Sequence, residues 1–96
     1  MLFRSRASAD RLAAAMARPD RLATRFMIEG HTDAVGNPAA NLDLSRRRAA
    51  SVVGYLAAKG VDTKRFVVEG YGSARPLPGM SAMAGANRRV VAKAIK

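Results

Sequence analysis

Two opposite charges near a turn are the residues of this chain best suited to recognise a ligand. Asp33 lies in the turn 30–36, directly after a strand-like run, and Arg48 follows 15 residues later on a predicted helix. A carboxylate accepts N–H donors from an ammonium group, and a guanidinium offers a planar fork to a carboxylate. The pair could therefore hold a small zwitterion without covalent chemistry. Spacing alone leaves open a second interpretation, an ordinary Asp–Arg surface salt bridge.

The residues of the same segment give little indication of a catalytic site or a metal site. His31, Asp33 and Ser45 could be arranged as a hydrolase triad, but the chain has a single histidine and lacks a Gly-x-Ser-x-Gly elbow. Zinc needs more ligands than His31 and Asp33 supply, and cysteine is absent. We therefore expect no enzyme activity, no metal and no cofactor. We expect His31 to fix the turn through a hydrogen bond from its ring to the backbone.

The composition indicates one small basic domain. Ninety-six residues, of which 49% are hydrophobic, fit a single globular unit, and we expect it to span 1–96. Seventeen Lys and Arg against seven Asp and Glu give a net charge of +10, so a nucleic acid or another polyanion is the alternative partner. The basic residues form no single stripe, and few aromatic residues are free to stack on bases, which makes nucleic acid the less favoured partner. We expect no export signal and no membrane-spanning segment in this chain.

The elements that must position Asp33 and Arg48 follow from local patterns. Asn37 is a suitable N-cap, Pro38 suits the first helical position, and Gly60 suits the end of the helix. Residues at three- and four-residue spacing along this helix predict a buried face, made of Leu42, Ser45, Ala49, Val52, Val53 and Leu56. Arg46, Arg47 and Lys59 are predicted to face solvent. The predicted elements are a helix at 8–18, a strand at 25–30, a helix at 38–59, and strands at 65–70 and 88–95.

A repeated run indicates how the strands pair. RFMIEG at 25–30 returns as RFVVEG at 65–70, with the long helix between them. A right-handed crossover would make these strands parallel neighbours and place the turn with Asp33 at the carboxyl end of its strand. With Leu2 and Phe3 as a short or atypical opening strand and a helix within 1–20, the chain predicts an α+β two-layer sandwich. Its order is βαβαβ(α)β, with a mixed four-stranded sheet and helices on one face.

Five ordered motifs resemble one family. They are IEGHTDAVG at 28–36, N-x-x-LS-x-x-RA at 41–49, YL-x-x-KGV at 55–61, EGYG at 69–72 and NRRV at 87–90. Their order and spacing strongly resemble the OmpA/MotB-type C-terminal peptidoglycan-binding domain, over about residues 25–92. The run Leu2 to Ser5 departs from the acid-bearing first strand that is usual in that family.

The resemblance implies a function and a site. It implies non-covalent binding of the diaminopimelate of the peptidoglycan stem peptide, which would tether an envelope protein or the outer membrane to the cell wall. The expected location is the periplasm, at the wall or outer membrane, with other envelope proteins as further partners. Asp33 and Arg48 would be the anchors. The remaining implied ligand-binding residues are Thr32, Ala34, Val35, Asn41, Leu42 and Arg89.

Overall fold

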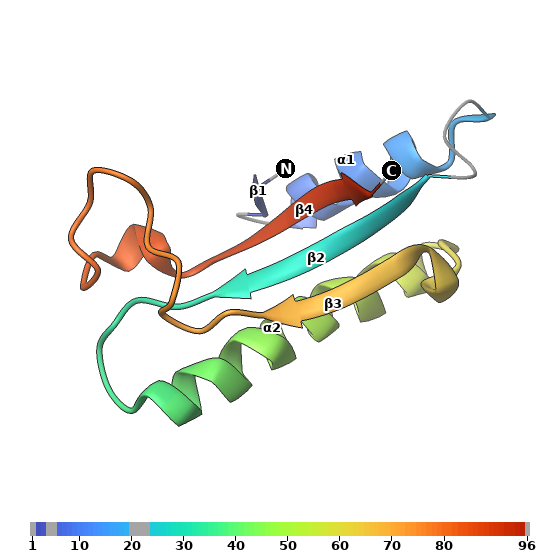
Figure 1. The fold of residues 1–96 in the computed structure, drawn as a ribbon. Helices are drawn as coiled ribbons and strands as arrows, with labels where there is room; N and C mark the ends of the chain where they lie inside the picture. The colour runs from blue at the N-terminus through green and yellow to red at the C-terminus, as the bar shows by residue number, and fades with distance from the viewer. Residues whose placement is uncertain (1, 4–5, 20–23, 96) are drawn as a thin grey trace.

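The protein consists of two helices packed against a mixed β-sheet (Figure 1). The computed structural model describes residues 2–3, 6–19 and 24–95. Arg4 and Ser5 of the expected opening run lie outside these residues, as do the ends of the predicted 1–20 segment and of the 1–96 domain. The elements are β1 (Leu2–Phe3), α1 (Arg6–Met16), β2 (Arg25–His31), α2 (Pro38–Ala58), β3 (Phe66–Gly70) and β4 (Arg89–Ile95), with 3₁₀ turns at Thr63–Arg65 and Gly85–Asn87.

The sheet has the order β1-β4-β2-β3. β2 and β3 run parallel, with Phe26 opposite Phe66 and Gly30 opposite Gly70, so the predicted parallel pairing of the two strands with α2 between them is confirmed. β4 runs antiparallel to β2 on its other side. The body of the sheet is formed by β2, β3 and β4, because β1 contributes only two residues at the edge of β4. The predicted α+β class is confirmed, and both helices lie behind the sheet in Figure 1.

Helix α2 begins and ends where its capping residues indicate. The Asn37 side chain accepts hydrogen bonds from the N–H groups of Ala39 and Ala40, and Pro38 opens the first turn. The helix ends at Ala58, and Gly60 then takes a positive φ of 93°. The predicted helix at 38–59 is therefore confirmed to within a residue. The first helix lies two residues earlier than predicted, at Arg6–Met16 instead of 8–18.

Two glycines let α2 lie directly on the sheet. A Cβ at Gly30 would come within 1.9 Å of the carbonyl oxygen of Ser45, and a Cβ at Gly70 within 2.7 Å of the Arg46 amide nitrogen. Glycine in a strand often marks such a close backbone approach. Beside this contact the core contains Met16 from α1, Ile28 from β2 and Leu56 from α2, all without solvent exposure. The N-terminal half of α2 is thereby fixed next to the carboxyl ends of β2 and β3.

Two sequence predictions about the fold need correction. Leu42, placed on the buried face of α2, is 38% exposed, because it lies beyond the end of the sheet near the N-terminus of the helix. The bracketed helix between the third and fourth strands is only the 3₁₀ turn Gly85–Asn87. Pro76, Pro78 and the positive φ of Gly79 break regular structure in that segment. Among the described residues, no helix is long and apolar enough to cross a membrane.

Candidate functional site

The turn with Asp33 lies at the carboxyl ends of β2 and β3, as predicted. The segment 71–88, between β3 and β4, folds over this end of the sheet beside the turn (Figure 1). Two backbone hydrogen bonds join them: Thr32 donates to the Gly72 carbonyl at 2.8 Å, and Ala34 donates to the Ala82 carbonyl at 2.9 Å. Residues far apart in sequence therefore enclose Asp33.

The Asp33 carboxylate is held in a defined orientation and is largely buried. Its Oδ1 accepts a hydrogen bond from the Val35 amide at 3.1 Å. Its Oδ2 accepts a hydrogen bond from Arg88 Nη1 at 3.0 Å. The Asp33 side chain is only 9% exposed, whereas that of Arg88 is 57% exposed. A largely exposed guanidinium therefore contacts Oδ2 of a carboxylate that itself has little contact with solvent.

The structure does not join Asp33 to Arg48. Arg48 is half-buried on α2 and makes no hydrogen bond or ion pair within the described part of the chain. It lies on the helix face of Asn41 and Ser45, seven residues beyond Asn41, roughly 10 Å along the axis. The simple salt bridge between the two residues, left open by their spacing, is therefore absent. Their assignment as the two ligand anchors remains a prediction.

The other expected ligand residues mainly build the turn. Thr32 Oγ1 donates to the Asp33 carbonyl at 2.9 Å, and Asn41 Nδ2 donates to the carbonyls of Val35 at 3.0 Å and Asp33 at 3.4 Å. The amide of Asn41 therefore ties the first turn of α2 to the Asp33 turn. Ala34 is partly exposed, while Val35 and Leu42 expose apolar surface next to it. Arg89 donates instead to the carbonyls of Arg75 and Asn87, at 3.0 and 3.2 Å.

Sequence reasoning missed the roles of Asn87 and Arg88. Asn87 is fully buried, where its Oδ1 accepts from the Leu77 amide at 2.7 Å and its Nδ2 donates to the Ser81 carbonyl at 2.9 Å. The side-chain amide of Asn87 thus joins parts of the segment 71–88. The next residue, Arg88, contacts Asp33. The signal was available in the NRRV motif. Its polar residues precede a strand, a position from which side chains can reach back to the end of the neighbouring β2.

His31 does not bond to the backbone as expected. Its Nε2 lies 3.2 Å from Glu29 Oε1, and the other Glu29 oxygen lies 3.3 Å from Lys93 Nζ. The His31 ring stacks on Tyr71 at 5.4 Å, and the Arg75 guanidinium lies 3.8 Å from the Tyr71 ring centre. Burial lowers the pKa of His31 more than the hydrogen bond to Glu29 raises it. His31 Nδ1 is buried without a hydrogen-bond partner among the described residues.

No hydrolase triad forms from His31, Asp33 and Ser45. The Ser45 hydroxyl donates to the Leu42 carbonyl at 2.7 Å and accepts from the Gly72 amide at 2.9 Å. The imidazole is engaged with Glu29 instead. Among the described residues, no cluster of three or more histidine or acidic side chains could hold a metal ion.

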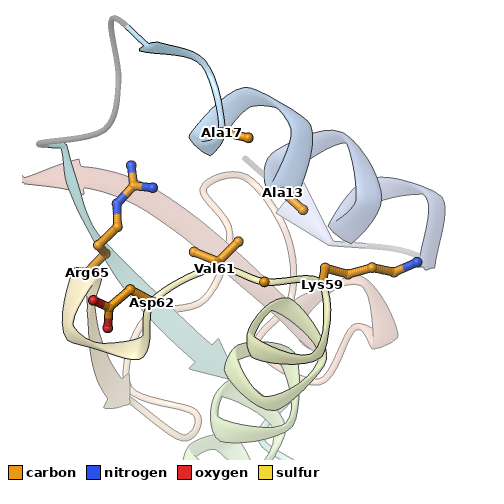
Figure 2. Close-up of a pocket in the computed structure, with 7 residues that line it drawn as sticks. Ala13, Ala17, Lys59, Val61, Asp62 and Arg65 are labelled. Atoms are coloured by element: carbon orange, nitrogen blue, oxygen red, sulfur yellow. The ribbon is translucent and has the colours of Figure 1, made fainter.

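A cavity of about 430 Å³ lies at the other end of the molecule, where α1 and α2 both end (Figure 2). Its charged groups serve the fold: Lys59 lies 3.6 Å from Asp10, Arg65 donates to the Met16 and Thr24 carbonyls, and Asp62 accepts from the Lys64 amide. The length of α2, 21 residues or roughly 30 Å, separates this end from the Asp33 turn. None of the expected site residues lines it. The lining residues are Ala13, Ala17, Lys59, Gly60, Val61, Asp62 and Arg65.

Comparison with known proteins decides the family. The model of the OmpA family matches residues 4–89, which is most of the chain. The chain belongs to the OmpA family. It is 46% identical over 63 residues to outer membrane protein A of Bordetella avium, an alignment that covers 64% of this chain and 32% of that protein. It is 44% identical over 54 residues to the peptidoglycan-associated lipoprotein of Haemophilus influenzae, covering 56% of this chain and 35% of the relative.

A solved structure extends the likeness to the whole fold. The crystal structure of the peptidoglycan-associated lipoprotein from Burkholderia pseudomallei superposes with a TM-score of 0.79 at 25% identity. It covers 93% of this chain and 75% of that structure. The chain spans only about a third of the length of the two curated relatives above. The alignments therefore match this OmpA-family chain to part of each of those longer proteins.

Proposed function

We propose that this OmpA-family chain is a non-enzymatic module that binds peptidoglycan and tethers an envelope protein or the outer membrane to the cell wall. Its ligand is the diaminopimelate of the stem peptide, a zwitterion. Family membership and the names of the relatives, outer membrane protein A and peptidoglycan-associated lipoprotein, support this proposal. The proposed location is the periplasm, in association with the wall or the outer membrane.

The Asp33 carboxylate is the observation that carries the proposal. It is largely buried at the carboxyl ends of two parallel strands, where open α/β sheets commonly bind ligands. The Val35 amide donates to Oδ1 of Asp33. Oδ2 is contacted by the Arg88 side chain, which is itself mostly exposed. An ammonium group can take the place of that exposed cation. Asp33 is therefore assigned to the ligand ammonium.

Arg48 is assigned to the ligand carboxylate. Its guanidinium has five N–H donors, and none is used in the described part of the chain. It is half-buried, which limits competition from water. Arg48 lies roughly 10 Å along α2 from Asn41, which contacts the Asp33 turn, so a ligand that spans the two charges would run along this stretch of the helix. The exposed apolar groups of Val35 and Leu42 flank this path.

A non-enzymatic role agrees with the hydrogen bonding of the site. The Ser45 hydroxyl and the His31 imidazole, which a hydrolase would need, are both buried and engaged elsewhere. Asp33 and Arg48 bind opposite charges and have no nucleophile between them. The proposed role is recognition alone.

Co-sedimentation with purified sacculi tests the proposal. The wild-type chain should pellet with sacculi, whereas Asp33→Asn and Arg48→Gln should each remain largely in the supernatant. Asp43 and Arg47 supply the matched controls, because they form an exposed pair at 2.9 Å on the same helix. Asp43→Asn and Arg47→Gln make the same charge changes and should pellet like wild type. Equal sedimentation of all five proteins would contradict the assignment.

The net charge of +10 favours a second candidate, a polyanion-binding module. Counterion release makes such binding fall steeply with salt, on a logarithmic scale. A DNA titration at increasing salt distinguishes the two. A polyanion binder should bind DNA with a steep salt dependence and lose nothing on Asp33→Asn. The proposed wall-binding module should lose its sacculus binding on Asp33→Asn at a fixed, physiological salt concentration.

A further inference from the structure

Arg88 already occupies the position that the proposed ligand ammonium must take. Its Nη1 lies 3.0 Å from Asp33 Oδ2, the carboxylate oxygen that does not accept from the Val35 amide. The Arg88 side chain remains 57% exposed, so it has contact with water on most of its surface. A ligand cation can replace it without dismantling the core. Displacement of Arg88 is then a step in every binding event at Asp33.

The segment before β4 is shaped to admit this guanidinium. A Cβ at Gly85 would lie 2.8 Å from Arg88 Nη2 and 3.3 Å from Arg88 Cζ. The Arg88 amide donates to the Gly85 carbonyl at 3.0 Å, which closes the 3₁₀ turn under the side chain. The buried amide of Asn87 anchors the same turn. The approach of Arg88 to Asp33 therefore depends on a glycine and on a fixed turn.

We propose that Arg88 is a specificity-determining residue that makes the site select zwitterions over simple amines. The inference rests on the proposed function and adds a role for a residue that the ligand must displace. A ligand that has an ammonium but no carboxylate breaks the Arg88–Asp33 pair and offers the Arg88 guanidinium no new anionic partner. Diaminopimelate carries a carboxylate on the same carbon as each ammonium, so besides the carboxylate assigned to Arg48 it brings one beside Asp33, with which the displaced guanidinium can form a bidentate hydrogen-bonded pair. Arg88 thus opposes the first ligand and assists the second.

Titration with two small probes tests this role. The probes are meso-2,6-diaminopimelate and its bis-amide, which keeps both ammonium groups and lacks both carboxylates. The wild-type chain should prefer diaminopimelate. In Arg88→Gln the bis-amide should bind more tightly and diaminopimelate more weakly, so that the ratio of the two affinities falls by roughly fivefold, the scale of an exposed ion pair. Calorimetry or chemical-shift titration gives both constants.

Further variants separate this role from net charge and from folding. Arg88→Lys keeps a cation near Asp33 and should retain most of the preference. Gly85→Ala displaces the guanidinium without removing its charge and should lower the ratio as Arg88→Gln does. Arg47→Gln removes one positive charge from the exposed pair on α2 and should leave the ratio unchanged. Thermal unfolding of each variant confirms that it is folded at the titration temperature.

The outcomes distinguish this inference from the proposed function. If wild type binds diaminopimelate through Asp33 but Arg88→Gln keeps the wild-type ratio, the inference is wrong and the proposed function stands. If wild type binds neither probe and does not pellet with sacculi, both are wrong. A fall in the ratio that Arg47→Gln reproduces equally would assign the preference to net charge and overturn the role of Arg88.

Discussion

The two Glu-Gly repeats have nearly the same sequence but different structural roles. RFMIEG forms nearly all of β2, in the interior of the sheet, and RFVVEG contains the whole of β3, at its edge. Glu29 of the first is 3% exposed and lies next to both His31 and Lys93, whereas Glu69 of the second is partly exposed and makes no ion pair among the described residues. A strand flanked on both sides receives side chains from its neighbours, and an edge strand receives them from one side only. Position in the sheet therefore determines what the shared sequence does.

Gly30 and Gly70, the glycines of the two repeats, both lie against α2, but a Cβ at each would meet different atoms. Both face α2, which is why Glu29 and Glu69 project from the opposite sheet face. The three atoms nearest to a Cβ at Gly30 are all Ser45 backbone, at 1.9 to 3.1 Å. At Gly70 only one of the three is backbone, the Arg46 amide nitrogen at 2.7 Å, and the nearest is the Arg46 side-chain Cγ at 2.3 Å. A side chain can rotate away more easily than a helix can move. The comparison thus predicts unequal tolerance at equivalent positions.

Gly30→Ala should have the largest effect on the free energy of unfolding. Its methyl group would lie 1.9 Å from the Ser45 carbonyl oxygen, so α2 must shift from the sheet. We expect a loss of about 3 kcal/mol, at the upper end of the usual cost of overpacking. Gly70→Ala should cost less, about 1 to 2 kcal/mol, because part of the clash is with the flexible Arg46 side chain. Urea denaturation measures both, and equal losses would refute the distinction between centre and edge.

Glu29→Gln should have the next largest effect. It removes a buried carboxylate that binds His31 and Lys93, and we expect a loss of about 2 kcal/mol, typical of hydrogen bonds to a charged group. Glu69→Gln at the matched position should change stability by no more than about 0.5 kcal/mol. Denaturant titration at neutral pH gives both values. A larger loss from Glu69→Gln than from Glu29→Gln would show that Glu29 is not the residue that stabilises this face.

Local patterns predicted the frame of the molecule, and long-range contacts account for what they missed. The cap at Asn37 and the alternating strands define α2 and the strand ends because these signals act between near neighbours. The repeat adds the parallel pair, because the same short pattern is visible in the sequence at both places. The Arg88–Asp33 pair joins residues 55 apart, and its existence depends on how the segment 71–88 folds. Nothing within a few residues of Asp33 indicates that partner. Family motifs indicated that NRRV matters, but drew attention to Arg89.

The residues that follow the repeats give the smallest expected effect, which is a pH dependence. His31 follows the β2 repeat and stacks on Tyr71, which follows the β3 repeat. Burial lowers the pKa of His31 most strongly, and the positive charges of Arg89 and Lys93 lower it further. Glu29 raises this pKa, but the net change is a lowering. The unfolded chain therefore takes up a proton at higher pH than the folded chain does. Stability attributable to His31 is complete above the ordinary histidine pKa of about 6.5 and decreases as the pH falls below it.

Wild type should therefore lose stability between pH 7 and pH 5.5 with a slope of at most about 1.4 kcal/mol per pH unit from this one group. His31→Gln removes the titrating ring, and because the chain has a single histidine, its unfolding free energy should be nearly flat over that interval. Tyr71→Phe keeps the stacked ring and serves as the matched control, with the wild-type slope. Denaturant titrations at several pH values compare the three. Stability that rises on acidification only when His31 is present would mean that Glu29 outweighs burial, and that the buried pair in β2 favours the charged imidazole.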